Sequence, residues 1–314
     1  MSQRAVVFGY HEVGVRGLAV LLELGRELGL EVPLVLTHED DPAESHWFAS
    51  VRDLCAWHGI HCLTPAQPNT PEVIAAVREA RPDWIFSFYY RRLLGKDLLA
   101  LPARGAFNLH GSLLPRYRGR APTNWAVLHG ERETGASLHR MDVKPDAGPL
   151  VDQQAVPILT NDTAHTVYGK LVCAAETLLL RAVPRMLAGT HEETPLDLAA
   201  GSYYGGRRPE DGRIDWGRSA WEVHNLIRAV APPYPGAFTD LGGQRLELLG
   251  SYFKGESARR PGVRLYWEDQ ACYVNCADGR RTRITRLAVG GEDLNQDRFR
   301  QAFGADSISV VSGR

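Results

Sequence analysis

Short apolar runs alternate with segments of helical periodicity over the first 110 residues of the chain. The runs are typical of buried strands, and the periodic segments are typical of helices that cover a sheet. This alternation predicts right-handed crossovers and an open, mainly parallel sheet with helices on both faces. Strands are expected at residues 5–8, 30–36, 61–65, 84–88 and 106–110, and helices at 17–28, 47–57 and 71–80.

The pattern changes in the second half of the chain. A long helical segment over about 163–187 is followed by a polar, aperiodic stretch, which is typical of a connection between domains. Beyond Gly236, short strand-like runs separated by Gly, Asp and Asn indicate a small antiparallel barrel or open sheet. We therefore predict an α/β protein with a catalytic domain over residues 1–189, a linker over 190–205 and a β-rich domain over 206–314.

Composition narrows the class of protein. The formal net charge of −1 over 314 residues gives no global field that would attract nucleic acid or an anionic membrane. Five irregularly spaced cysteines favour a reducing compartment, and Cys272 and Cys276 fit a strand core better than a metal site. The apolar runs are too short to span a membrane, and the first residues lack the pattern of a signal peptide. We expect a soluble cytoplasmic protein without a metal.

The first loop, GYHEVGVRG, is rich in glycine but lacks the G-x-G-x-x-G spacing of a dinucleotide site. We interpret its glycines as turn residues. An oxidoreductase is correspondingly less favoured.

Asn108, His110 and Asp146 are the candidates for chemistry. Asn108 and His110 lie two residues apart at the carboxyl end of a predicted strand, so their side chains share a face where ligands of open α/β sheets bind. A carboxylate from Asp146 can hydrogen-bond the imidazole and raise its pKa. Each residue alone is more often structural. Together, a base and an amide N–H donor are the equipment for acyl transfer to an amine.

The loop that follows His110 carries Arg116, Arg118 and Arg120 among Pro and Gly. A solvated basic loop is the commoner interpretation, and bidentate recognition of an anion is the functional one. The aromatic segment 87–94 likewise fits either core packing or a wall for a flat heterocycle.

The stretch FNLHGSLLPRYRGRAPTNWAVLHGERETGASLHRM, followed by DAG, resembles the formyltetrahydrofolate-dependent formyltransferases, which include methionyl-tRNA and sugar N-formyltransferases. The similarity runs from Ala5 to about Phe238. IFSFYYRRLL and YYGGRRPEDGRIDW look most like the members that act on UDP-4-amino-4-deoxy-L-arabinose in lipid A modification and polymyxin resistance. The resemblance implies a Rossmann-like domain followed by a smaller barrel-like (OB-like) domain.

The resemblance also implies residue roles. It places the oxyanion-stabilising asparagine on Asn108, the catalytic histidine on His110, and the aspartate that raises the pKa of that histidine on Asp146. The implied cosubstrate is N10-formyltetrahydrofolate. Its contacts fall on Arg92, Leu93, Leu94, Arg120, Asp142, Val143, Lys144, Pro145 and Asp146.

The implied reaction is transfer of the formyl group to the 4-amino group of a UDP-linked amino sugar. Methionyl-tRNA formyltransferase is the alternative, but it needs a basic face for tRNA, and the arginines of the C-terminal region are interleaved with acids. A nonenzymatic folate or nucleotide-sugar binding module is less favoured, because a binder needs no base and oxyanion donor together. We expect small-molecule partners, with neither nucleic acid nor membrane insertion.

Overall fold

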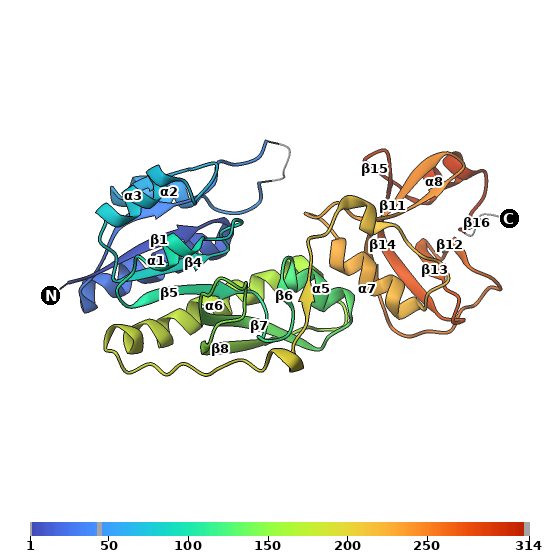
Figure 1. Cartoon of the computed structure of the whole chain (residues 1–314). Helices are drawn as coiled ribbons and strands as arrows, with labels where there is room; N and C mark the ends of the chain where they lie inside the picture. Colours follow the sequence, from blue (N-terminus) through green and yellow to red (C-terminus); the bar gives the residue numbers. More distant parts are fainter. Residues whose placement is uncertain (1, 43–45, 311–314) are drawn as a thin grey trace. The chain divides into compact units, whose positions relative to one another are not determined.

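The computed structural model describes residues 2–42 and 46–310, which fall into two compact units. The first unit holds residues 1–122, 134–156 and 169–205, and the second holds 123–133, 157–168 and 206–314. Two segments from the middle of the chain, 123–133 and 157–168, therefore group with the C-terminal region (Figure 1). The predicted domain ends at residues 1 and 314 lie outside the described residues, and the boundaries at 189 and 206 remain a prediction.

The first unit is built on a sheet of seven strands. They are Gln3–Gly9 (β1), Leu30–Leu36 (β2), His61–Leu63 (β3), Trp84–Phe88 (β4), Gly105–His110 (β5), Glu133–Arg140 (β7) and Leu150–Pro157 (β8). Their order is β3-β2-β1-β4-β5-β7-β8. The first five strands pair in parallel, and β7 runs antiparallel to β5. The predicted mainly parallel sheet is confirmed.

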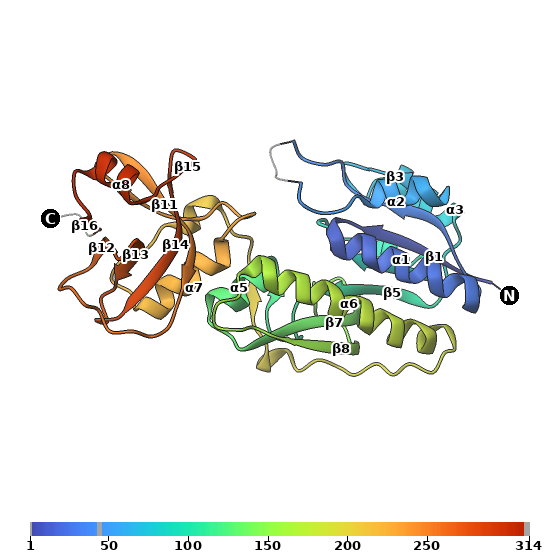
Figure 2. The same cartoon turned by 180° about the vertical axis from the view of Figure 1, so that it is seen from behind.

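Helices cover both faces of this sheet. They are His11–Leu28 (α1), Val51–His58 (α2), Pro71–Glu79 (α3), Lys96–Leu99 (α4) and Ala164–Leu187 (α6). Ile85 of β4 packs in a core with Val77 of α3, whereas Phe88, on the opposite face of the same strand, packs under α1. An ion pair between Arg16 and Glu176 joins α1 to α6, which lie side by side in Figure 2. No described helix is long and apolar enough to cross a membrane.

The interpretation of GYHEVGVRG as a loop with turn glycines is wrong, because α1 already begins at His11. Gly14 and Gly17 lie inside this helix and are buried. A Cβ on Gly17 would lie 2.6 Å from a ring carbon of Phe88, so a larger residue would push the helix off the sheet. These glycines permit close packing of helix on strand.

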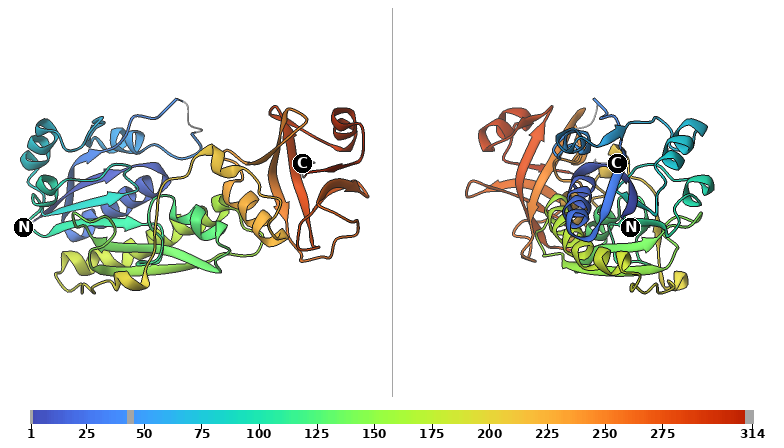
Figure 3. Two further views of the ribbon diagram at one scale, coloured as in Figure 1. Left: turned by 45° about the vertical axis from the view of Figure 1, so that its right-hand side comes forward. Right: turned by 90° about the vertical axis from the view of Figure 1, so that its left-hand side faces the viewer.

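The second unit is an antiparallel sheet with helices packed on it, shown in orange and red in Figure 3. Its strands are Ala237–Leu241 (β10), Gln244–Tyr252 (β11), Arg264–Glu268 (β12), Ala271–Asn275 (β13), Arg281–Val289 (β14), Glu292–Asp293 (β15) and Ser307–Ser309 (β16). The helical segments are Pro122–Leu128 (α5), which belongs to this unit from residue 123 on, Pro209–Gly212 (η2), Ala220–Val230 (α7) and Gln296–Phe303 (α8). The capping box of Ser219 and Glu222 opens α7 as predicted. The β-rich C-terminal fold is confirmed.

Residues 190–205, the predicted linker, are tied to the first unit. Thr194 forms a bridge with Leu150, a short helix spans Leu198–Ala200 (η1), and Tyr203–Tyr204 (β9) pairs in parallel with Arg118–Gly119 (β6). The segment therefore supports the arginine-containing loop.

Candidate active site

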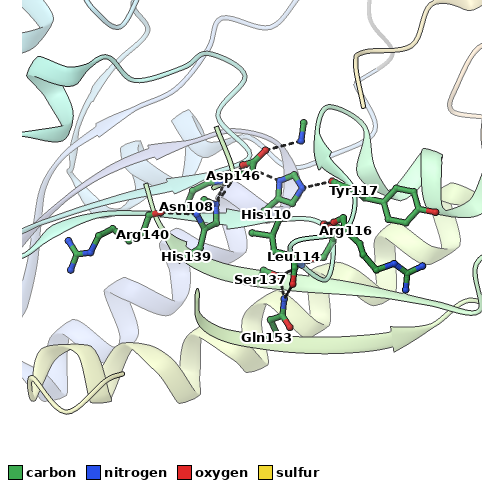
Figure 4. A network of polar contacts seen from close by, with 12 residues as sticks. Asn108, His110, Leu114, Arg116, Tyr117, Ser137, His139, Arg140, Asp146 and Gln153 are labelled. Carbon is green, nitrogen blue, oxygen red and sulfur yellow. Dashed lines mark hydrogen bonds and ion pairs between the residues drawn. The ribbon is translucent and has the colours of Figure 1, made fainter. Parts of the chain in front are cut away.

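Asn108, His110 and His139 point from neighbouring strands to one face of the sheet. Asn108 and His110 are two residues apart on β5, so their side chains share a face. The antiparallel register sets His139 of β7 directly opposite Asn108, on that same face. Both imidazoles are buried, with 6% of His110 and 1% of His139 exposed. Figure 4 shows the three side chains converging with Asp146 in a small volume.

His110 commits one ring nitrogen to a fixed hydrogen bond. Its Nε2 lies 2.8 Å from the carbonyl oxygen of Tyr117. Because a carbonyl oxygen only accepts, Nε2 carries the proton of the neutral ring and donates it to Tyr117. The basic nitrogen is then Nδ1, which lies 3.5 Å from Oδ1 of Asp146. The site therefore keeps one nitrogen able to take up a proton beside a carboxylate.

Asp146 sits between the two histidines. Its backbone adopts the left-handed region, with a φ of 52°. Its Oδ2 accepts a hydrogen bond of 2.9 Å from the backbone N–H of Gly119, and its Oδ1 lies 3.6 Å from Nε2 of His139. Burial alone would raise the pKa of the Asp146 carboxyl, but His110, His139 and the Gly119 N–H outweigh burial and hold this pKa well below its usual range. Asp146 is therefore ionised near neutral pH.

The pKa of His110 reflects two opposing influences. Burial lowers this pKa and is the larger influence, while the Asp146 carboxylate and the hydrogen bond to Tyr117 raise it. The upward influence of Asp146 is as expected from the sequence, but the burial of the ring, which exceeds it, was not predicted. The net shift is downward, so the imidazole is neutral and able to accept a proton near neutral pH.

A hydrogen-bonded hub on β7 and β8 fixes the loop that follows His110. Ser137 Oγ donates to the carbonyl of Ser112 at 2.6 Å and accepts from the backbone N–H of Leu114 at 3.1 Å. The side-chain amide of Gln153 donates to Ser137 Oγ and to the carbonyl of Leu114, each at 2.8 Å. The loop is thus held to the sheet, as Figure 4 shows.

The same loop is held from the other side by residues 202–204. The backbone N–H of Tyr117 donates to Ser202 Oγ at 2.8 Å, and the ring of Tyr117 stacks on Tyr204. These contacts fix the carbonyl that accepts the His110 proton and the N–H of Gly119 that holds Asp146.

The three arginines of the loop differ in their surroundings. Arg116 is exposed and its side chain points away from His110 in Figure 4, with its guanidinium 5.7 Å from the ring of Tyr117. Arg118 is half-buried, and its Nε has no hydrogen-bond partner among the described residues. Arg120 is exposed.

The predicted cofactor residues lie in two connections and at the end of the arginine loop. Arg92, Leu93 and Leu94 follow β4; Leu93 is 70% exposed, whereas Leu94 packs against the core. Residues 142–145 follow β7 and are mostly exposed. Among the predicted cofactor residues, all of which are described, only Asp146 forms a hydrogen bond or ion pair with Asn108 or His110. No described group of His, Cys, Asp and Glu side chains is arranged to hold a metal ion.

Two family models match the chain. The model for formyl transferase matches residues 21–183, and the model for the formyl transferase C-terminal domain matches residues 207–302. The first match alone spans more than half of the chain. This chain belongs to the formyl transferase family. The family and the enzyme class that the central stretch indicated are thereby confirmed.

Solved structures of two N-formyltransferases and of HypX share the fold. An N-formyltransferase from Helicobacter canadensis, in complex with folinic acid and dTDP-3-aminofucose, has a TM-score of 0.70 at 20% identity, over 90% of this chain and 99% of that chain. WlaRD, a sugar 3N-formyl transferase in the presence of dTDP and 5-N-formyl-THF, has a TM-score of 0.71 at 19% identity, over 93% and 99%. HypX from Aquifex aeolicus, in complex with tetrahydrofolic acid, has a TM-score of 0.64 at 20% identity, over 96% of this chain and 48% of that chain.

Sequence reasoning missed His139, although it lies in the quoted central stretch. Alternation along 133–140 puts Ser137 and His139 on one face, but only the register with β5 brings His139 opposite Asn108. The Tyr117 carbonyl and the Gly119 N–H were also missed. Both are backbone groups, so no residue type marks them in the sequence.

Proposed function

We propose that this formyl transferase moves the formyl group from N10-formyltetrahydrofolate to the amine of a nucleotide-linked sugar, with UDP-4-amino-4-deoxy-L-arabinose as the favoured acceptor. The cluster of Asn108, His110 and Asp146 carries the proposal, because it combines a neutral base, a carboxylate and an amide N–H donor. The folate and amino-sugar ligands of the solved relatives support the two substrate classes.

His110 acts as the base. As the sugar amine attacks the formyl carbon and the new C–N bond forms, the amine proton goes to Nδ1 of His110, since Nε2 is committed to Tyr117. The imidazolium that results lies beside the Asp146 carboxylate, which stabilises its charge. The proton then passes to N10 of the folate as the C–N10 bond breaks, so the products are a formamide and tetrahydrofolate.

Asn108 stabilises the oxyanion of the tetrahedral intermediate. Its side-chain amide has two N–H donors on Nδ2, which lies 3.2 Å from Nε2 of His139, and one of the two is donated to that nitrogen. The second N–H is left for the developing negative charge on the formyl oxygen. Arg92, Leu93, Leu94, Arg120 and the connection 142–145 are proposed to hold the folate, with much of the binding through backbone groups.

A product assay by mass spectrometry tests this proposal. The enzyme is offered N10-formyltetrahydrofolate with UDP-4-amino-4-deoxy-L-arabinose, with dTDP-linked 3-amino and 4-amino sugars, or with methionyl-tRNA. Formylation of a nucleotide sugar is expected, and the mass gain should be lost with His110→Ala. Formylation of the tRNA alone would exclude a sugar acceptor, and formylation of only a dTDP-linked sugar would exclude the arabinose substrate.

A further inference from the structure

His139 is a buried histidine of the cluster to which the proposed reaction gives no role. It lies on β7 opposite Asn108 and is 1% exposed. Its Nδ1 lies 2.8 Å from the carbonyl oxygen of Arg140. Its Nε2 lies 3.2 Å from Nδ2 of Asn108 and 3.6 Å from Oδ1 of Asp146. His139 therefore touches two of the three residues proposed to act in catalysis.

The hydrogen bonds of His139 determine its tautomer. The carbonyl of Arg140 only accepts, so Nδ1 carries the proton of the neutral ring. Nε2 then presents a lone pair and accepts an N–H from the amide of Asn108. A protonated ring would require the opposite orientation, with the amide oxygen of Asn108 turned toward His139.

This acceptor has a consequence for Asn108. The two ends of a side-chain amide have nearly the same shape, so only hydrogen bonds decide which end faces which way. With one N–H held on His139, the amide presents its second N–H in a fixed direction. Without that acceptor, the amide can rotate and present its oxygen to an oxyanion, which would be repelled.

We propose that His139 is a positioning residue, which orients the Asn108 amide through the lone pair of Nε2. This inference rests on the proposed function, in which Asn108 is the oxyanion donor. His139 itself touches neither substrate. Its contribution is to keep the donor of Asn108 pointed toward the developing charge.

Steady-state kinetics with a matched pair of variants test the proposal. His139→Phe keeps a flat buried ring without nitrogen, and His139→Gln keeps an acceptor near the position of Nε2. With Phe, kcat is expected to fall about 10²-fold, because misplacing a catalytic group typically costs a factor of this size. KM should change less than about threefold. With Gln, most of kcat should return. His191→Phe is the control, since His191 is a half-buried histidine that faces a carboxylate, Glu193, but does not contact the cluster.

The proposal is overturned if folded His139→Phe keeps kcat within about twofold of the unaltered enzyme, or if Gln and Phe are equally slow. A measurement without substrate separates this result from failure of the proposed function. Nitrogen-15 NMR at about pH 8 should show His139 protonated on Nδ1, and Asn108→Ala should shift its Nε2 resonance. A proton on Nε2, or no shift, overturns the inference even if no sugar is formylated.

Discussion

His110 and His224 are both buried histidines, but their surroundings prepare them for different tasks. His224, on α7, has both nitrogens satisfied by neutral groups: Nε2 donates to the carbonyl of Thr160 at 2.9 Å, and Nδ1 accepts from Ser251 Oγ at 2.8 Å. His110 has one nitrogen satisfied, while the other faces the carboxylate of Asp146. Of these two histidines, only His110 has a ring nitrogen beside a carboxylate, which is what the proposed role as a base requires.

The neighbours of His224 strengthen this contrast. Arg228, the next charged residue on the same face of α7, is 2% exposed and donates to oxygens of Asn225, Val127, Leu159 and Asp162. These bonds tie segments 123–133 and 157–168 to α7, all within the second unit. Burial first, and then the charge of Arg228, lowers the pKa of His224 to about 4. The cluster of His224 and Arg228 therefore holds segments together and has no proton to exchange near neutral pH.

The largest expected effect is on the rate of His110→Ala. Removal of a general base costs about 10²–10⁴-fold, so kcat for formylation should fall by this factor. Circular dichroism should show that the variant stays folded. His224→Gln is the matched control, because it changes an equally buried histidine, and its kcat at about pH 8 should stay within about twofold. Equal losses in the two variants would remove the distinction between the two histidines.

Asp146→Asn should change both the size and the pH dependence of the rate. Asparagine keeps an acceptor for the Gly119 N–H, but it removes the charge that raises the pKa of His110. The pKa of His110 therefore falls further, and the acid limb of the kcat profile should move to lower pH. Loss of the carboxylate that stabilises the imidazolium should also reduce kcat by about 10²-fold. A pH–rate profile with its acid limb unmoved would show that Asp146 does not tune His110.

The sequence predicted most of the elements around this site, because strand and helix periodicity is a local property. Residues 30–36 and 84–88 are strands with those bounds. The motif also brought out Asn108, His110 and Asp146, whose types suit the chemistry. It did not identify His139, because the pairing of β5 with β7 is set by the tertiary structure and cannot be predicted from the local sequence. Arg228 was likewise missed, because a single arginine in an amphipathic helix is expected to be exposed, and the carbonyls that surround it are known only from the structure.

Arg228→Met should affect stability rather than chemistry. Methionine has a similar length but no donors, so four oxygens inside the second unit each lose the hydrogen bond from Arg228. The carbonyls of Val127 and Leu159 keep one backbone N–H donor each. A buried acceptor without a partner costs about 1–3 kcal/mol, and we expect a total loss of about 4 kcal/mol in the free energy of unfolding. Urea unfolding measures this loss. A variant within about 1 kcal/mol of the unaltered protein would show that these bonds are not needed to hold the segments.

The smallest expected effect is the pH dependence that His224 gives to stability. Its pKa is about 4 in the folded protein and ~6.5 in the unfolded chain. Above pH ~6.5, His224 is neutral in both states, and its contribution to the free energy of unfolding is fully present. Between pH ~6.5 and about pH 4, His224 is protonated in the unfolded chain but not in the folded protein, so the free energy of unfolding decreases as pH falls. The integrated loss is about 3 kcal/mol. Urea unfolding at about pH 8 and about pH 4.5 should therefore show a smaller drop for His224→Gln than for the unaltered protein. Parallel profiles would mean that His224 takes up its proton without unfolding, as His110 is proposed to do, and would erase the difference between the two histidines.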